Sequence, residues 1–148
     1  ATNPNPLTLT MRILLLLFPL FPATFLFAQD PADIFHKTID LDSINQLSFD
    51  VYANDNYTIK PWPGDDILIE TRVVLNNGEP HILKFFLQKK RWDLEPTITG
   101  DALVLASGDK KRRVVQGTAG TTSETVNIVI YVPELFSNDN GIYRRKEQ

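Results

Sequence analysis

Apolar and polar residues alternate along most of the chain after residue 38, a pattern typical of strands that bury one face. Turn-forming residues separate the alternating stretches, among them Asn54-Asp55-Asn56 and Pro63-Gly64-Asp65. The longest stretch, 67–75, has apolar residues on both faces and is expected to be central in its sheet. The pattern predicts strands at residues 39–41, 47–53, 57–61, 67–75, 92–98, 103–105 and 126–132.

The period changes at one place, between Pro80 and Lys90. Apolar residues there lie four apart, as in Ile82 and Phe86, which is the spacing of one face of a helix. Proline suits the first turn of a helix, and the basic residues that follow suit its negative C-terminal end. We therefore expect one short amphipathic helix at about 80–90. Its apolar face is expected to cover the sheet rather than to lie on a membrane.

These elements predict a mainly β fold, an antiparallel β-sandwich or a rolled sheet with one short amphipathic helix. Antiparallel pairing is expected because the turns are of hairpin length, whereas parallel neighbours need a long crossover. Residues 29–136 are expected to form a single β-rich domain that opens with a polar lead-in. Residues 108–123 are interpreted as a long polar connection, and residues 137–148 as a disordered polar tail.

The stretch from Met11 to Asp30 has the composition of a secretory signal peptide, which we assign to residues 11–28. Arg12 gives a short positive start, an uncharged apolar run follows, and Ala28 before Gln29 offers a cleavage position. An uncleaved N-terminal anchor is the alternative, although the run is shorter than the roughly 20 residues that a membrane span needs. Residues 1–10 are interpreted as an upstream extension that is not structural.

The remaining 120 residues amount to one domain. Loss of residues 1–28 would remove only Arg12 and change the net charge from −3 to −4, which disfavours a nucleic-acid binder. The sequence contains no cysteine, which excludes disulfides, a thiolate nucleophile and cysteine zinc sites. Because small secreted eukaryotic domains are usually rich in disulfides, we expect the periplasm or cell surface of a Gram-negative bacterium.

Several sequence segments together resemble an adhesin-like family of exported β-rich domains of unknown function from Gram-negative bacteria. They are YTIKPWPGDDILIETRV at Tyr57, the end of the predicted helix in KKRWDLEP, the GDALVL strand and the closing VNIVIYVPE. The resemblance covers residues 39–135, and its most specific parts are residues 62–66 and the last strand. It implies an envelope setting and a binding or structural role, and it brings no catalytic motif with it.

Candidate binding residues are the aromatic side chains Tyr52, Tyr57 and Trp62, which lie on or beside one predicted hairpin. Aromatic rings on a sheet can stack on sugars or anchor a protein partner. His36 and His81 have no spacing that suggests a metal site or a catalytic triad and are expected on the surface. The sequence predicts no catalytic residue, no metal and no cofactor. A weaker alternative uses carboxylates for sugar hydrolysis or calcium, with the candidates Asp50, Asp55, Asp65, Asp66 and Asp101.

Two basic runs, 89–91 and 110–113, are explained by the end of the predicted helix and by a solvated loop. They lack the interleaved aromatics of single-strand nucleic-acid binders. We therefore expect an exported, non-enzymatic β-domain with a binding, adhesion or envelope structural role, whose partner is another envelope protein or a surface glycan. The alternatives are a small extracytoplasmic hydrolase acting on sugar or cell-wall substrates, and a module that contacts lipid or lipopolysaccharide. Membrane contact is the less favoured partner.

Overall fold

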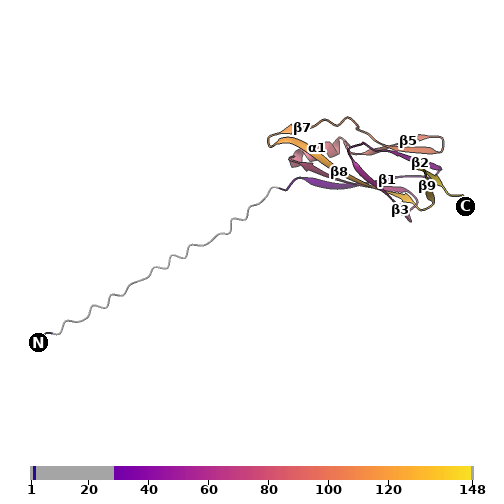
Figure 1. Cartoon of the computed structure of the whole chain (residues 1–148), viewed down its shortest axis with the longest axis horizontal. Coiled ribbons are helices and arrows are strands. Elements are labelled where there is room, and N and C mark those ends of the chain that lie inside the picture. Colours follow the sequence, from indigo (N-terminus) through magenta and orange to yellow (C-terminus); the bar gives the residue numbers. More distant parts are fainter. Residues whose placement is uncertain (1, 3–28, 148) are drawn as a thin grey trace.

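The computed structural model describes Thr2 and residues 29–147, so the interpretations of residues 1–28 as extension and signal peptide lie outside the described residues. The described chain is mainly β, with 56% of residues in strands and 8% in one short helix. Two mixed sheets lie face to face and do not close into a barrel (Figure 1). The expected mainly β class with one short helix is therefore confirmed.

The first sheet contains five strands and is built around the longest ones. Its main path runs in the order β1-β4-β8-β3, and β7 pairs with the first part of β8. The central strands β4 and β8 pair antiparallel over nine residue pairs, from Leu68 with Tyr131 to Asn76 with Ser123. The bounds are β1 Ala32–Ile39, β3 Asn56–Trp62, β4 Ile67–Asn76, β7 Val115–Gly117 and β8 Gly120–Pro133.

The second sheet has the order β5-β6-β2-β10-β9. Its outer strand β5 carries Pro96, and β3 at the rim of the first sheet carries Pro61. Proline cannot donate a ladder hydrogen bond, so both prolines occupy edge strands, where they also discourage pairing with other chains. The bounds are β2 Gln46–Asp50, β5 Leu94–Thr99, β6 Ala102–Ser107, β9 Phe136–Asp139 and β10 Ile142–Arg145.

The expectation that all strands pair antiparallel is wrong for two pairs. β2 runs parallel to β6, and β3 runs parallel to β8. The argument from hairpin-length turns holds only for strands that follow each other directly in the chain. β2 and β6 are separated by more than 50 residues. The chain forms strands of the other sheet between them and has ample length for a crossover.

Three segments without expected strands prove to contain strands. One is the expected polar connection at 108–123, which contains β7 and the first residues of β8. The polar lead-in contains β1, which pairs with β4 over its whole length and has only one buried residue, Ile39. Residues 137–145, expected as part of a disordered tail, belong to the β9–β10 hairpin. Its turn consists of Asn140 and Gly141, both with positive φ, which is the combination that a tight two-residue hairpin requires. Arg145 holds this hairpin to the body by donating to the backbone oxygens of Leu41 and Ile44.

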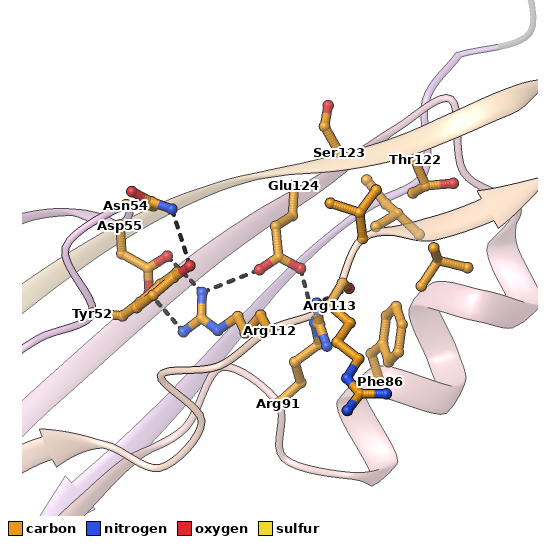
Figure 2. A pocket seen from close by; sticks show the side chains of 13 residues that line it. Tyr52, Asn54, Asp55, Phe86, Arg91, Arg112, Arg113, Thr122, Ser123 and Glu124 are labelled. Atoms are coloured by element: carbon orange, nitrogen blue, oxygen red, sulfur yellow. Dashed lines mark hydrogen bonds and ion pairs between the residues drawn. The ribbon is translucent and has the colours of Figure 1, made fainter.

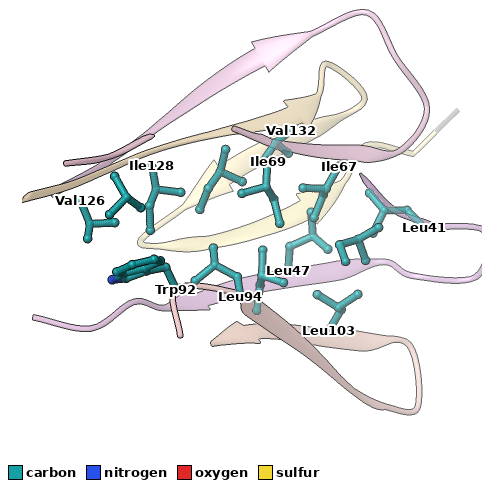
Figure 3. Close-up of a cluster of buried hydrophobic side chains, with 14 of the residues drawn as sticks. Leu41, Leu47, Ile67, Ile69, Trp92, Leu94, Leu103, Val126, Ile128 and Val132 are labelled. Carbon is teal, nitrogen blue, oxygen red and sulfur yellow. The ribbon is translucent and has the colours of Figure 1, made fainter. Parts of the chain in front are cut away.

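The hydrophobic core lies between the two sheets (Figure 3). The alternation along β4 and β8 places every second residue in it, such as Ile69 from β4 and Ile130 from β8. The second sheet contributes Leu47 and Leu105, which are fully buried. Trp92, just before β5, is the largest side chain in this core at 1% exposure.

The helix α1, Pro80–Gln88, follows the expected bounds to within two residues. Leu83 is buried, and Ile82, Phe86 and Leu87 pack against the core, so the helix covers one end of the sandwich. Its outward side keeps Phe85 at 49% exposure. No helix in the described part of the chain is both long and apolar enough to cross a membrane.

Candidate functional site

A pocket of about 180 Å³ lies at the end of the sandwich that carries α1 and β7 (Figure 2). Its wall combines segments that are far apart in the sequence: the turn between β2 and β3, the helix, the loop after it, the loop before β7, and the start of β8. The wall includes the side chains of Tyr52, Asp55, Phe86, Arg91, Arg112, Arg113, Val114 and Glu124.

Arg112 and Asp55 form the central ion pair of this pocket. The two terminal nitrogens of Arg112 donate to the two carboxylate oxygens of Asp55 at 2.6 and 2.7 Å, and each side chain is only 2% exposed. The guanidinium also lies 4.7 Å from the centre of the Tyr52 ring, a cation–π contact. Tyr52 is fixed in turn, because its backbone N–H donates to Ser107 Oγ. The loop before β7 is thereby bound to the β2–β3 turn.

Glu124 and Arg91 form a second pair beside the first. Arg91 Nε donates to Glu124 Oε2 at 2.9 Å, and Arg112 Nη1 reaches the other oxygen at 3.2 Å. Arg91 also donates to the backbone oxygen of Arg113 and stacks over the Phe86 ring at 4.4 Å. The network thus joins two arginines and two carboxylates, and it ties the helix end, β8 and the loop before β7 together.

Burial shifts the ionisation of the central pair. It raises the pKa of Asp55 above its ordinary value, although the hydrogen bonds and the charge of Arg112 act in the opposite direction. For Arg112, burial alone would lower the pKa, but the hydrogen bonds and charges of Asp55 and Glu124 outweigh it and raise the pKa. Arg112 therefore stays charged at every ordinary pH, whereas burial makes the ionised form of Asp55 harder to keep.

Two neighbouring residues of the pocket wall, Arg113 and Val114, are exposed. Val114 is 65% exposed, and the exposed Arg113 side chain has no hydrogen-bond or ion-pair partner among the described residues. The oxygens of Asp55 and Glu124 are already occupied by arginine donors, so the pocket presents a free cation and apolar surface rather than free carboxylates. No group of three or more histidine, aspartate or glutamate side chains in the described part could hold a metal ion.

The three predicted aromatic residues do not share one surface. Tyr52 belongs to the pocket wall, where its ring stacks on Arg112. Tyr57 and Trp62 lie on opposite faces of β3, because they are an odd number of residues apart in a strand. Trp62 folds over its own turn: its Nε1 donates to the Asp66 backbone oxygen at 2.9 Å, and a Cβ on Gly64 would collide with its ring.

The predicted carboxylates are also separated. Asp50 pairs with Lys110, and Asp55 pairs with Arg112. Asp65 and Asp66 lie beyond the far end of β3, which begins directly after Asp55 and runs to Trp62. Asp101 accepts from Asn45 Nδ2, so the five do not form one cluster.

Both histidines lie on the surface, as expected, where each has one carboxylate neighbour. His36 contacts Glu70 at 3.0 Å, and His81 contacts Glu79 at 3.2 Å.

Sequence reasoning missed three of the four charged residues in the network. Arg112 was expected in a solvated loop, but its side chain is almost completely buried. The missing signal was Glu124, which occupies an inward position in the alternation Glu124, Val126, Ile128, Ile130. A carboxylate at a buried position needs a counterion, and the nearest basic run in the sequence was the one to search.

Comparisons with protein-family models, with curated proteins and with solved structures found no match to this chain.

Proposed function

We propose that this protein is an exported, non-enzymatic β-domain that binds another component of a Gram-negative cell envelope, with a role in adhesion or in envelope structure. Its binding surface is the end of the sandwich formed by α1, the loop before β7 and the pocket between them. The export segment and the resemblance to adhesin-like domains support the setting. The observation that carries the proposal is the buried ion network, which holds Arg113 and Val114 at the surface.

The physical reason is preorganisation. A loop that binds a partner loses less conformational entropy when it is already fixed in its bound position. Here the four-charge network fixes the loop before β7 through Arg112, while the next two side chains remain outside it. The network would be an unneeded desolvation cost for a loop with no task, because apolar residues could close this end at least as well.

The carboxylates do not favour the alternative of a hydrolase. A general acid and a nucleophile must both reach the substrate. Asp55 is 2% exposed in its side chain and gives both oxygens to Arg112. Asp65 and Asp66 lie too far along the fold to complete a pair with it.

Site-specific photo-crosslinking tests the proposed surface. A photoreactive residue replaces Val114, and a matched control replaces Ile98, which is 59% exposed on the edge strand β5. With envelope extracts we expect adducts from position 114 only, and excess unlabelled chain should suppress them. Equal labelling at both positions, or turnover of a cell-wall substrate by the pure protein, would contradict the proposal.

Export is tested separately by cell fractionation and mass spectrometry. We expect a chain that begins at Gln29 in the envelope fraction. A cytosolic chain that retains residues 1–28 would remove the proposed location.

A further inference from the structure

Two basic runs that are about 20 residues apart in the sequence lie side by side in the fold. The link is Arg91, which donates to the backbone oxygen of Arg113 at 2.9 Å and lies 3.8 Å from Asp109. The end of α1 and the loop before β7 therefore form one continuous surface. Figure 2 shows Arg113 beside Phe86 of the helix, at the place where the two segments meet.

This surface carries an excess of unpaired positive charge. Arg91, Lys110 and Arg112 have carboxylate partners. Five further cations are exposed and have no ion-pair partner among the residues that the structure describes; they are Lys84, Lys89, Lys90, Lys111 and Arg113. We call these five residues, with Phe85 and Val114, the basic end. The excess is local, since the whole chain has a net charge of −3.

Apolar side chains protrude from the same surface. Phe85 is 49% exposed on the outward side of α1, and Val114 is 65% exposed in the loop. Both adjoin Phe86: the rings of Phe85 and Phe86 are 5.8 Å apart, and Val114 lines the pocket with Phe86. Lys89 Nζ lies 5.7 Å from the centre of the Phe85 ring, so a cation and an exposed ring are direct neighbours on this surface.

We propose that the basic end docks on a membrane surface whose lipid headgroups carry anionic phosphates. The proposal rests on the proposed function, because it names the envelope component that this surface binds. Charge complementarity selects an anionic occupant. Phe85 and Val114 favour a lipid surface over a soluble polyanion. Exposed apolar side chains stabilise binding only where the partner removes them from water.

Geometry agrees with peripheral docking. The inward side of α1 packs against the core, so the helix lies on the body with only its outer side free. Lys84 and Gln88, like Phe85 and Lys89, are four residues apart and therefore neighbours on that side. Helices that lie on membranes place apolar residues about 5–10 Å into the headgroup region with lysines around them. Here the loop before β7 adds Arg113 beside Phe86, and Lys111 is exposed two residues earlier on the same loop.

Vesicle co-sedimentation tests this inference. The full chain and its variants are prepared in identical form and mixed with vesicles of phosphatidylcholine, with or without about one-third phosphatidylglycerol. Binding to neutral vesicles measures any contribution of residues 1–28. We expect excess binding to anionic vesicles at about 10 mM salt and its loss near 1 M salt, where the Debye length falls from about 30 Å to about 3 Å.

Matched double variants locate the contact. Each cation near an anionic surface contributes about a fivefold change in affinity, so Lys111→Gln with Arg113→Gln should weaken binding by roughly 25-fold. The control is Lys60→Gln with Arg72→Gln, which removes the same charge from the outer face of the first sheet and should change binding less than about twofold. Equal losses in both doubles, or no excess binding to anionic vesicles at low salt, would overturn the inference.

Phe85→Ser separates lipid from other polyanions. It should weaken vesicle binding and leave binding to inorganic polyphosphate unchanged. Vesicle affinity that survives Phe85→Ser and is fully competed by polyphosphate would assign the surface to a soluble polyanion instead. Failure of this inference is distinguishable from failure of the proposed function: if vesicles are ignored but position 114 still crosslinks to lipid-free envelope protein, only the lipid assignment is wrong.

Discussion

Replacement of Arg112 by methionine should lower the free energy of unfolding much more than its position in a polar loop suggests. Arg112 donates two hydrogen bonds to Asp55, one to Glu124 and one to the Asp109 backbone oxygen, and its side chain is 2% exposed. Methionine fills similar space but leaves the Asp55 carboxylate buried without a counterion. Breaking one partner of a buried pair costs about 3–5 kcal/mol, a large part of the 5–15 kcal/mol that stabilises a typical domain.

Urea unfolding followed by tryptophan fluorescence measures this cost, since Trp92 is buried in the core. With a slope of about 1.5 kcal/mol per molar urea, the midpoint should fall by about 2–3 M. The control is Arg144→Met. Arg144 pairs with Asp139 on the surface, where the two side chains are 47% and 57% exposed, so its loss should cost less than about 1 kcal/mol.

A double variant tests the cause. Arg112→Met with Asp55→Leu removes both charges of the central pair and leaves Arg91 with Glu124, which still balance each other. Because replacing a whole buried pair with apolar residues is often neutral, most of the lost stability should return. If the double variant is as unstable as the sum of the single variants, or if Arg112→Met costs no more than Arg144→Met, the assignment of a desolvated charge is wrong.

Three further predictions follow from single positions. Because burial raises the folded-state pKa of Asp55, its contribution to stability is full below its ordinary pKa and is lost as the pH rises through the raised value. The unfolding free energy of wild type relative to Asp55→Asn should therefore increase as the pH falls from 7 to about 4. Urea titrations at both pH values would contradict this if the difference shrinks. Gly141→Ala should cost about 1–2 kcal/mol because φ at Gly141 is +90°, whereas Gly108→Ala, without a positive φ, should change the urea midpoint little. Gly64→Ala should cost about 1–3 kcal/mol and shift the tryptophan emission, since its Cβ would displace the Trp62 ring; unchanged emission and midpoint would show that the ring is not held there.

The positions of most strands and of the helix could be predicted from the sequence because both depend on local periodicity. In β4 the buried residues Ile67, Ile69, Val73 and Leu75 follow the alternation without exception. The helix is similarly marked by its spacing of four. These signals need no knowledge of the partner, since each element only has to present one apolar side.

Pairing could not be predicted in the same way. Alternation says which face of β3 is buried, but it does not say that β8 will lie parallel to it rather than antiparallel. That choice depends on how the chain crosses between the two sheets, which is a property of the whole topology. β1 was missed for a related reason: its single buried residue, Ile39, gives almost no pattern, whereas the strand pairs with β4 at eight positions.

The final hairpin was missed although its signal was present. Asn140-Gly141 between Phe136 and Tyr143 is a hairpin turn with inward-facing aromatic residues on both strands. The polar composition of the last twelve residues concealed it. Polar composition indicates only that a segment is soluble, whereas an Asn-Gly pair indicates a specific backbone geometry. The Asn-Gly pair is therefore the stronger evidence for the local structure.

The buried charges give the candidate site its particular character. A row of apolar residues on the inward face of β8 ends at Glu124, and the loop before β7 closes over that point through Arg112. An apolar contact there would hold the loop with similar strength but would accept several positions of it, because such contacts have no direction. Two hydrogen bonds from one planar guanidinium to one carboxylate accept a single orientation. Compared with an apolar contact, the network therefore adds little stability but fixes the positions of Arg113 and Val114. Binding should depend on these fixed positions.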